Sequence, residues 1–293
     1  MKHLILLMIA LSFSFISQAA VNQKVMSKVP EAQVQSVLNA HKNLGYVPVF
    51  IDGFQHSVGN STSLRKKTFF NIVFEKSNNV NGYKVYIANQ IIVHASGQRI
   101  IFLESYKNGR GQLRFAMIIK KHNNNTKFKA THGRSSNFQS VFNTQKARGY
   151  HIKNRSVVRV RGVNYTTALF ERSNVGSWLS KPNLSAAQAT AKMVANKNAG
   201  RTLVHMDIPT GSPTKYNLIF HQKPTNAGWY ARNNLTYNQL LTAISNAKNA
   251  GYRTTLVCGF DVPGLINGNE VAKLRFAATF VKPSGVGGFV ISN

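Results

Sequence analysis

Acidic residues are scarce in this sequence. The chain of 293 residues holds only eight Asp and Glu against 37 Lys and Arg, which gives a formal net charge of +29 at pH 7. So few carboxyl groups leave little material for catalysis by paired carboxylates. A surface this positive attracts polyanions and repels its own copies, and solubility alone does not require so large an imbalance. The charge therefore favours a function in binding anions.

Cysteine is nearly absent as well, and so are motifs for cofactors. Cys258 is the only cysteine, which excludes an intrachain disulfide, and we interpret it as a small buried apolar residue. The nine histidines show no metal-ligand spacing, and the sequence contains no phosphate-binding glycine loop. We therefore expect no cofactor and no metal.

Long apolar runs are missing apart from one at the N-terminus. Leu4–Ile16 is apolar except for two serines, follows a short basic start and precedes Ser17-Gln18-Ala19. This pattern is typical of a secretory signal peptide, and the run is shorter than the roughly 20 residues that cross a bilayer. We expect a signal peptide over residues 1–19, cleaved after Ala19 or alternatively after Ala20. The mature protein, without a transmembrane segment, is then expected to be secreted, with the periplasm as the alternative.

What the sequence does contain is a repeat. Glycines that precede strand-like runs are spaced 52, 52, 51 and 51 residues apart, at Gly45, Gly97, Gly149, Gly200 and Gly251. A later apolar strand in each unit is followed, eight or nine residues on, by an aromatic residue: Tyr83, Phe128, Trp178, Trp229 and Phe289. The two markers predict five tandem copies of a unit of about 51 residues. We expect each aromatic side chain to pack one unit on the next.

The segment before each glycine has the spacing of a helix. Leu240, Ile244 and Ala247 follow the helical apolar period, and Ser185 and Thr236 are expected to be N-caps. The glycine ends the helix in a left-handed conformation, and two strands rich in Val, Ile, Phe and Thr follow. Each unit is therefore predicted to be a helix plus a β-hairpin, which places the chain in the α+β class.

Two units depart from this pattern. The second has too few residues between Tyr83 and Gly97, so its helix is expected to be about two turns shorter or missing. The fifth has an insertion between its strands, from Pro263 to Lys273, which we interpret as a candidate functional loop.

The unit boundaries predict one domain over residues 20–293, with units at approximately 29–80, 81–127, 128–177, 178–228 and 229–293. The first unit has no aromatic residue before its helix, whereas Phe289 follows the last strand of the fifth. Every unit has one junction aromatic residue if Phe289 packs against the first unit. This predicts a closed, propeller-like ring, with an open solenoid as the alternative.

Two near-identical motifs carry a family resemblance. They are Trp178-x5-Leu184-Ser185-x2-Gln188 and Trp229-x5-Leu235-Thr236-x2-Gln239. They resemble the bacterial tandem repeat domain of exported proteins, which is found N-terminal to secreted β-lactamase-like serine hydrolases such as polyglycine hydrolases. The resemblance is clearest in the last two units and covers essentially all of the mature chain. It implies a ring-like α+β module without established chemistry, here a stand-alone, target-binding copy without the hydrolase domain.

Catalytic motifs are weak. Ser63 and Ser212 each precede a lysine by three residues, as a β-lactamase-type nucleophile would, but the Lys-Thr-Gly motif is absent. Asp52, Glu104 and Asp207 each lie seven residues after a repeat glycine, which indicates a structural role. Asp207 with Asp261 stays open as the acid pair of a hydrolase with an unrecognised site. The sequence thus leans against an enzyme without excluding one.

Basic residues gather near the first hairpin, in the link between the second and third units, and in the third unit. The predicted polyanion-binding residues are Arg65, Lys66, Lys67, Lys120, Lys121, Lys127, Lys129, Arg134, Arg148, Lys153, Arg155, Arg159 and Arg161. Strand alternation is expected to place Lys153 with Arg155, and Arg159 with Arg161, on shared faces.

We therefore expect a non-catalytic protein that recognises an acidic or sulfated, glycosaminoglycan-like polysaccharide or an anionic cell surface. Extracellular DNA is the second choice of polyanion. A secreted hydrolase and a factor that binds a specific host protein are the alternatives from other classes.

Overall fold

The computed structural model describes residues 22–58, 65–92, 97–121, 127–209, 214–222, 228–266 and 269–283, with the side chains of 264–271 excepted. The described residues form fifteen strands and four α-helices, and the strands make five three-stranded sheets, so the α+β class is confirmed. Among these residues, no helix is both long and apolar enough to cross a membrane. The expected signal peptide and Phe289 lie outside the described residues.

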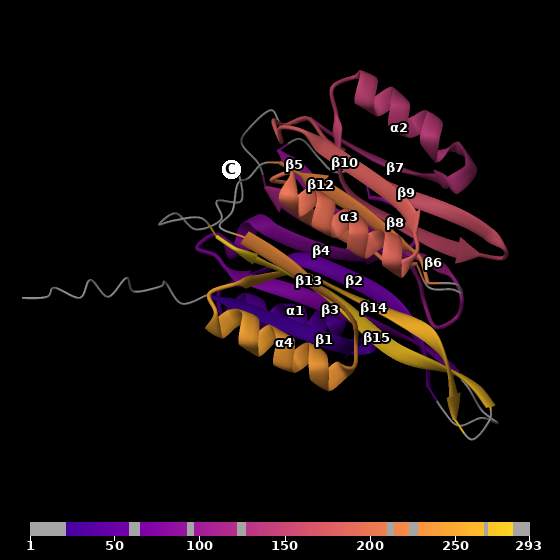
Figure 1. Cartoon of the computed structure of the whole chain (residues 1–293). Coiled ribbons are helices and arrows are strands. Elements are labelled where there is room, and N and C mark those ends of the chain that lie inside the picture. The colour runs from indigo at the N-terminus through magenta and orange to yellow at the C-terminus, as the bar shows by residue number, and fades with distance from the viewer. Residues whose placement is uncertain are drawn as a thin grey trace, which may run out of the picture.

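Five units of similar design follow one another along the chain (Figure 1). The first comprises β1 (Gln23–Pro30), α1 (Val34–Asn43), β2 (Tyr46–Val58) and β3 (Arg65–Lys76). The second comprises β4 (Tyr83–Ala88), β5 (Gln98–Lys107) and β6 (Leu113–Lys121). The third comprises β7 (Phe128–Arg134), α2 (Phe138–Ala147), β8 (His151–Val160) and β9 (Val163–Glu171).

The last two units are built in the same way. The fourth comprises β10 (Trp178–Leu184), α3 (Ala186–Asn198), β11 (Thr202–Asp207) and β12 (Tyr216–His221). The fifth comprises β13 (Gly228–Leu235), α4 (Tyr237–Asn249), β14 (Arg253–Ile266) and β15 (Asn269–Lys282). In every sheet the third strand of the unit lies in the middle, antiparallel to the first and second strands.

Local sequence signals explain where the helices begin and end. Ser185 and Thr236 cap α3 and α4, and each forms a reciprocal capping box with the glutamine three residues later. Helices α1 and α2 instead begin from short 3-10 turns, without a side-chain cap. All five repeat glycines are left-handed, with φ between +70° and +79°. The predicted caps and helix ends are thus confirmed.

The middle strand of each sheet supplies the core. Phe74, Phe170, Phe220 and Phe280 occupy the equivalent position and are fully buried. Burying a phenyl group of this kind contributes about 1.5–3 kcal/mol. Because this strand is covered on both faces, its residues read as a nearly continuous apolar run.

The second unit has no α-helix in its described residues. Residues 89–92 follow β4 without helical structure, and Ile91 and Ile92 pack against the apolar cluster of that unit's sheet. The expectation that this helix is shortened or missing is confirmed for the described residues.

The insertion in the fifth unit is not a loop. Its residues extend the hairpin, because β14 and β15 stay in register from Asp261↔Leu274 out to Ile266↔Asn269. The interpretation of residues 263–273 as a functional loop is therefore wrong for the described residues, 263–266 and 269–273, whose backbone continues the ladder. Figure 1 shows this hairpin extending beyond the body of the molecule.

Hydrogen bonds link the second strands of neighbouring units. The residue seven positions after a repeat glycine accepts, through its side chain, a backbone N–H from the preceding unit. These bonds run from Gly53 to Glu104 (3.1 Å), from Ser105 to Ser156 (2.8 Å), from Val157 to Asp207 (3.1 Å) and from Gly259 to Asp52 (2.9 Å). Between the fourth and fifth units, the Cys258 thiol donates to the Met206 carbonyl oxygen instead (3.1 Å). The Gly259–Asp52 bond joins the fifth unit to the first.

The aromatic residues at the unit junctions pack as expected. Trp178 lies against Phe142 of α2, with ring centroids 5.6 Å apart, and the Trp229 indole donates to the Arg201 carbonyl oxygen at 2.8 Å. In the first unit the equivalent position in β1 belongs to Gln23, ahead of the predicted boundary at residue 29. The Gln23 amide donates to Thr254 O (2.7 Å) and accepts from Thr254 N (2.9 Å). This polar clamp to the fifth unit thus occupies the position at which the other four units carry an aromatic residue.

Candidate anion-binding site

The structure separates the predicted basic residues between two ends of the module. We call the end where the second strands begin, just after the repeat glycines, the glycine end, and the end where the second and third strands join the hairpin end. The glycine end holds Lys120, Lys121, Lys127, Lys129, Arg148 and Lys153. The hairpin end holds Arg65, Lys66, Lys67, Arg134, Arg159 and Arg161.

The expected pairing of basic residues on strand faces is wrong. A bulge between Ile152 and Asn154 interrupts the alternation of β8. As a result, Lys153 reaches Glu171, whereas the Arg155 guanidinium lies 4.4 Å over the Phe138 ring. Arg155 is 9% exposed and is a core residue rather than a surface ligand.

The second expected pair does not share a strand face either. Arg161 lies in the turn beyond the end of β8, with φ +47°. Arg159 is exposed at the end of that strand, and its Nε donates to the Gly162 carbonyl oxygen. The basic stripe predicted along the third unit therefore does not exist as one surface.

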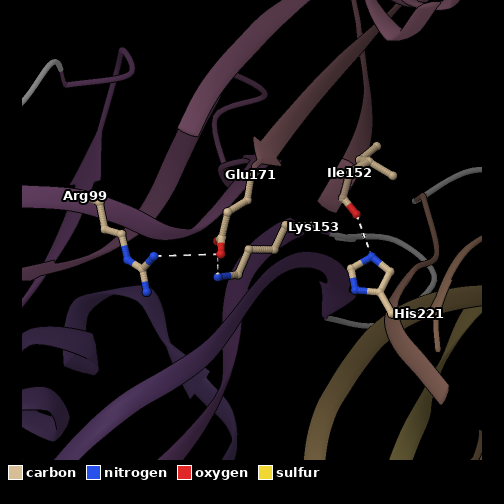
Figure 2. Close-up of polar contacts among 5 residues, drawn as sticks. All are labelled: Arg99, Ile152, Lys153, Glu171 and His221. Carbon is tan, nitrogen blue, oxygen red and sulfur yellow. Dashed lines mark hydrogen bonds and ion pairs between the residues drawn. The ribbon is translucent and has the colours of Figure 1, made fainter. Parts of the chain in front are cut away.

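At the glycine end, a buried carboxylate joins the second and third units. Glu171 lies between Lys153 Nζ (2.7 Å) and Arg99 Nη1 (3.8 Å), as Figure 2 shows. Burial by itself raises the pKa of Glu171, but Lys153 and Arg99 outweigh it and hold that pKa below the ordinary value. Glu171 is therefore ionised at neutral pH.

Lys120 completes a group of three cations around this single acid. Its pKa is lowered by burial and by the nearby charges of Arg99 and Lys153. Its Nζ also lies 5.4 Å over the Tyr83 ring. We call Arg99, Lys120, Lys153 and Glu171 the cation cluster, and its formal charge is positive.

Two histidines lie beside the cation cluster and add no charge at neutral pH. The His151 and His221 rings meet edge to face, with centroids 4.9 Å apart, and His221 Nε2 is 2.9 Å from the Ile152 carbonyl oxygen (Figure 2). Burial lowers the pKa of each histidine to about 4, and the nearby positive charge of Lys153 also lowers it.

Sequence reasoning missed Arg99, although one signal was present. Arg99 follows Gly97 within an otherwise apolar run that forms a buried strand, and it is 2% exposed. A buried arginine requires a buried partner of opposite charge. The sequence offers only eight acidic residues as candidates for that partner.

Asp207 and Asp261, the two acids of the possible catalytic pair, contact different partners. Asp207 accepts from Val157 N and from the Asn217 amide at 2.7 Å, whereas Asp261 lies 2.6 Å from His56 Nδ1. Burial raises the pKa of Asp52 and Asp207 to about 7 and raises that of Glu104 well above its ordinary value.

These three buried acids line a cavity of about 20 Å³, which holds about one water molecule. Their role as structural acceptors is confirmed, although the N–H groups they bind belong to a neighbouring unit. Across the described residues, no group of three or more His, Cys, Asp or Glu could hold a metal ion. Ser63 and Ser212, the two serines of the hydrolase-like motifs, lie outside the described residues.

A chain built from five such units is a tandem-repeat protein of the α+β class. The family model for the polyglycine hydrolase-like structural repeat matches residues 27–77, 125–173 and 226–283, which is just over half of the chain. The chain belongs to this repeat family. The matched ranges hold the first, third and fifth units, whereas the fourth unit, on which part of the resemblance depended, lies outside them. No curated protein matches the chain.

Proposed function

We propose that this chain is a secreted, non-catalytic binding protein that recognises an acidic or sulfated polysaccharide at the glycine end of its second and third units. The observation that carries the proposal is the half-buried Lys120, which lies opposite Arg99 in the sheet and close to Lys153, while Glu171 pairs with Lys153 and Arg99. An anionic cell surface presents the same chemistry.

Charge imbalance at a half-buried site favours an anionic ligand. Mutual repulsion among cations is stronger where water is partly excluded, and a bound sulfate or carboxylate group relieves it. Exposed basic residues near the cation cluster enlarge the positive surface that a charged polymer could contact. They are Lys121, Lys127, Lys129, Arg148 and Arg172. A flexible polymer with regularly spaced acid groups matches that arrangement better than a single small anion.

We also propose that the five units close into a propeller-like ring. Support comes from the bonds between the fifth and first units, namely Gly259 N to Asp52 and the two bonds between Gln23 and Thr254. A closed ring has no free end at which units could separate, so it would hold the cations of neighbouring units in fixed positions.

Secretion is part of the same proposal. Its support is the N-terminal pattern of a basic start, an apolar run and small residues up to Ala19. Expression of the full sequence in a bacterial host should deliver a protein whose N-terminal residue is Ala20 to the medium, or to the periplasm. Intact Met1 on the protein recovered from the cytoplasm would contradict this.

Heparin-affinity chromatography in a salt gradient tests the binding site. The variant Lys121→Gln/Lys129→Gln removes two exposed cations beside the cation cluster. Lys66→Gln/Lys67→Gln removes the same charge from the hairpin end and serves as the matched control. We expect the first variant to elute at lower salt and to reduce the slope of log K against log salt, because each phosphate- or sulfate-like contact releases about one counterion.

The control variant should elute close to the native protein. Equal shifts in both variants would show that only net charge matters and would overturn the assignment to the glycine end. Elution of the native protein below physiological salt would overturn the polyanion function itself.

A further inference from the structure

A groove of about 250 Å³ lies between the first and second units, lined by one face of α1 and by the beginnings of β2 and β4. The helix contributes Gln35, Leu38, Asn39 and Lys42, which share a face because they follow the spacing i, i+3, i+4, i+7. Its volume is below the roughly 300–1,000 Å³ of sites for drug-sized ligands, so it suits a single small ring.

The repeat explains why the groove exists at this junction. Counted from the repeat glycines, Leu38 of α1 corresponds to Phe142 of α2. By strand register, Tyr83 corresponds to Trp178. Between the third and fourth units, the Phe142 and Trp178 rings meet with centroids 5.6 Å apart. At the first junction, the smaller Leu38 and Tyr83 side chains leave that space open.

The lining of the groove has the character of a sugar site. Its apolar part includes Leu38 and Val85, and the amides of Gln35 and Asn39 lie beside it and hydrogen-bond to each other at 2.9 Å. Apolar surface with adjacent amides matches a pyranose ring, which presents C–H groups on its faces and hydroxyl groups around its edge.

The charged residues that line the groove are both positive, although Glu75 lies opposite Val47 in the sheet beside it. Lys42 and Lys84 line it, and no Asp or Glu does. It also adjoins the cation cluster, because Tyr83 lines the groove and carries Lys120 over its ring. An acidic sugar would therefore find cations both in the groove and next to it.

From this geometry we infer that the groove between α1 and β4 binds one acidic pyranose unit, a uronate or sulfated sugar, of the polysaccharide that contacts the cation cluster. The inference rests on the proposed polyanion function and names its ligand as a glycan rather than a nucleic acid. A flat nucleobase needs open ring faces for stacking. Here Lys76 Nζ lies 5.0 Å over the Tyr46 ring and Lys120 lies over Tyr83, so one face of each of these rings is already covered.

Two variants of the whole protein test the groove by different means. Leu38→Phe/Tyr83→Trp introduces the pair that fills the third junction and leaves the net charge unchanged. Lys42→Gln/Lys84→Gln removes the charge and keeps the space. The matched control is Lys248→Gln/Lys24→Gln, because Lys248 and Lys24 occupy the equivalent positions in α4 and β1, away from the groove.

Calorimetric titration with trigalacturonate, its neutral methyl ester and a short single-stranded DNA gives the readout. We expect the native protein and the Lys24/Lys248 control to bind trigalacturonate alike and to prefer it to the methyl ester. Both groove variants should bind it at least about tenfold more weakly. If the filled variant does not fold, as judged by its circular dichroism, the Lys42/Lys84 variant decides.

The inference would be overturned if the groove variants bound trigalacturonate as tightly as the native protein does, or if the native protein did not bind trigalacturonate. The inference would also be overturned if the native protein bound the DNA more tightly than trigalacturonate and both groove variants lost that DNA binding. Retention of the native protein on heparin in any of these cases would leave the proposed function standing, so the two failures are distinguishable.

Discussion

The backbone N–H of Gly259 donates a 2.9 Å hydrogen bond to Asp52 Oδ2, across 207 residues of sequence. This contact holds β14 of the fifth unit against β2 of the first. The residue must be glycine, because a Cβ at position 259 would lie 2.6 Å from carbon atoms of the Phe54 ring. The ring cannot move freely, since Phe54 is itself buried among core side chains.

Gly259→Ala is therefore expected to destabilise the whole module. Overpacking of this kind costs about 1–3 kcal/mol, and the mutation would also strain the bond to Asp52. Chemical denaturation monitored by tryptophan fluorescence measures the loss. Gly133→Ala is the control, because a Cβ at Gly133 meets no atom within 4 Å, and it should change stability by less than about 0.5 kcal/mol. Equal effects of the two substitutions would contradict a close contact between the first and fifth units.

The Gln23 clamp makes a separate prediction about the same junction. Gln23→Ala removes two hydrogen bonds to Thr254 and leaves the Thr254 N–H and carbonyl groups in a buried place without these partners. We expect a loss of about 1–3 kcal/mol and faster hydrogen exchange of the Thr254 amide. Unchanged protection of that amide would count against a joined first and fifth unit. The control is Gln35→Ala, at an exposed position of α1, and it should leave the hydrogen exchange of the Thr254 amide unchanged.

Much of this architecture could be predicted because its determinants are local. A left-handed residue after a helix favours glycine wherever it occurs, and Ser185 with Gln188 forms a capping box from four neighbouring residues. The repeat period, the helix ends and the missing helix of the second unit all follow from such signals.

The remaining features depend on contacts that no local pattern encodes. The bulge in β8 sends Lys153 and Arg155 to opposite sides, and only tertiary packing on Phe138 reveals where the guanidinium goes. The ion pair between Arg99 and Glu171 joins residues of two units. The groove beside α1 exists where Leu38 and Tyr83 take the places that Phe142 and Trp178 fill at the junction of the third and fourth units, which matters only once the units are stacked.

The buried acid Asp207 is expected to make stability decrease as pH rises. Burial raises its pKa to about 7 in the folded protein, against about 3.8 when unfolded. Between these values the folded state holds a proton that the unfolded state has released, which lowers the free energy of unfolding by about 1.4 kcal/mol per pH unit. Asp207→Asn mimics the protonated acid and keeps an oxygen for Val157 N and the Asn217 amide. Its stability relative to the native protein should rise from pH 4 to pH 7 and then level off; a constant difference would contradict this.

The buried histidine His205 should act in the opposite direction. Burial lowers its pKa from 6.5 to about 4, so below pH 6.5 the unfolded state takes up a proton that the folded state refuses. Its contribution to stability is therefore lost as pH falls from about 6.5 to 4. His205→Gln can still donate to the Arg155 carbonyl oxygen, which His205 Nε2 contacts at 2.6 Å. In thermal melts, the melting temperature of the variant relative to that of the native protein should be higher at pH 4.5 than at pH 7.5. An equal difference at both pH values would refute the assignment.

Glu171 connects stability to the proposed function. Glu171→Gln removes the carboxylate that pairs with Lys153 and Arg99, and breaking a buried pair in this way costs about 3–5 kcal/mol. The same loss should strengthen anion binding, because a bound sulfate group then supplies the missing negative charge. We therefore expect a lower melting temperature in the absence of anions, and a larger rise on adding a heparin oligosaccharide than the native protein shows.

Glu75→Gln is the matched control for this experiment, because Glu75 follows Phe74 as Glu171 follows Phe170. Glu75 lies 4.0 Å from Arg253, in a more exposed pair that belongs to the first and fifth units. Its loss should cost less stability and should change the response to heparin less than the loss of Glu171 does, because its ion-pair partner is Arg253. If both variants respond to heparin as the native protein does, the anion does not bind at the cation cluster, and the positive charge of the second and third units has another role.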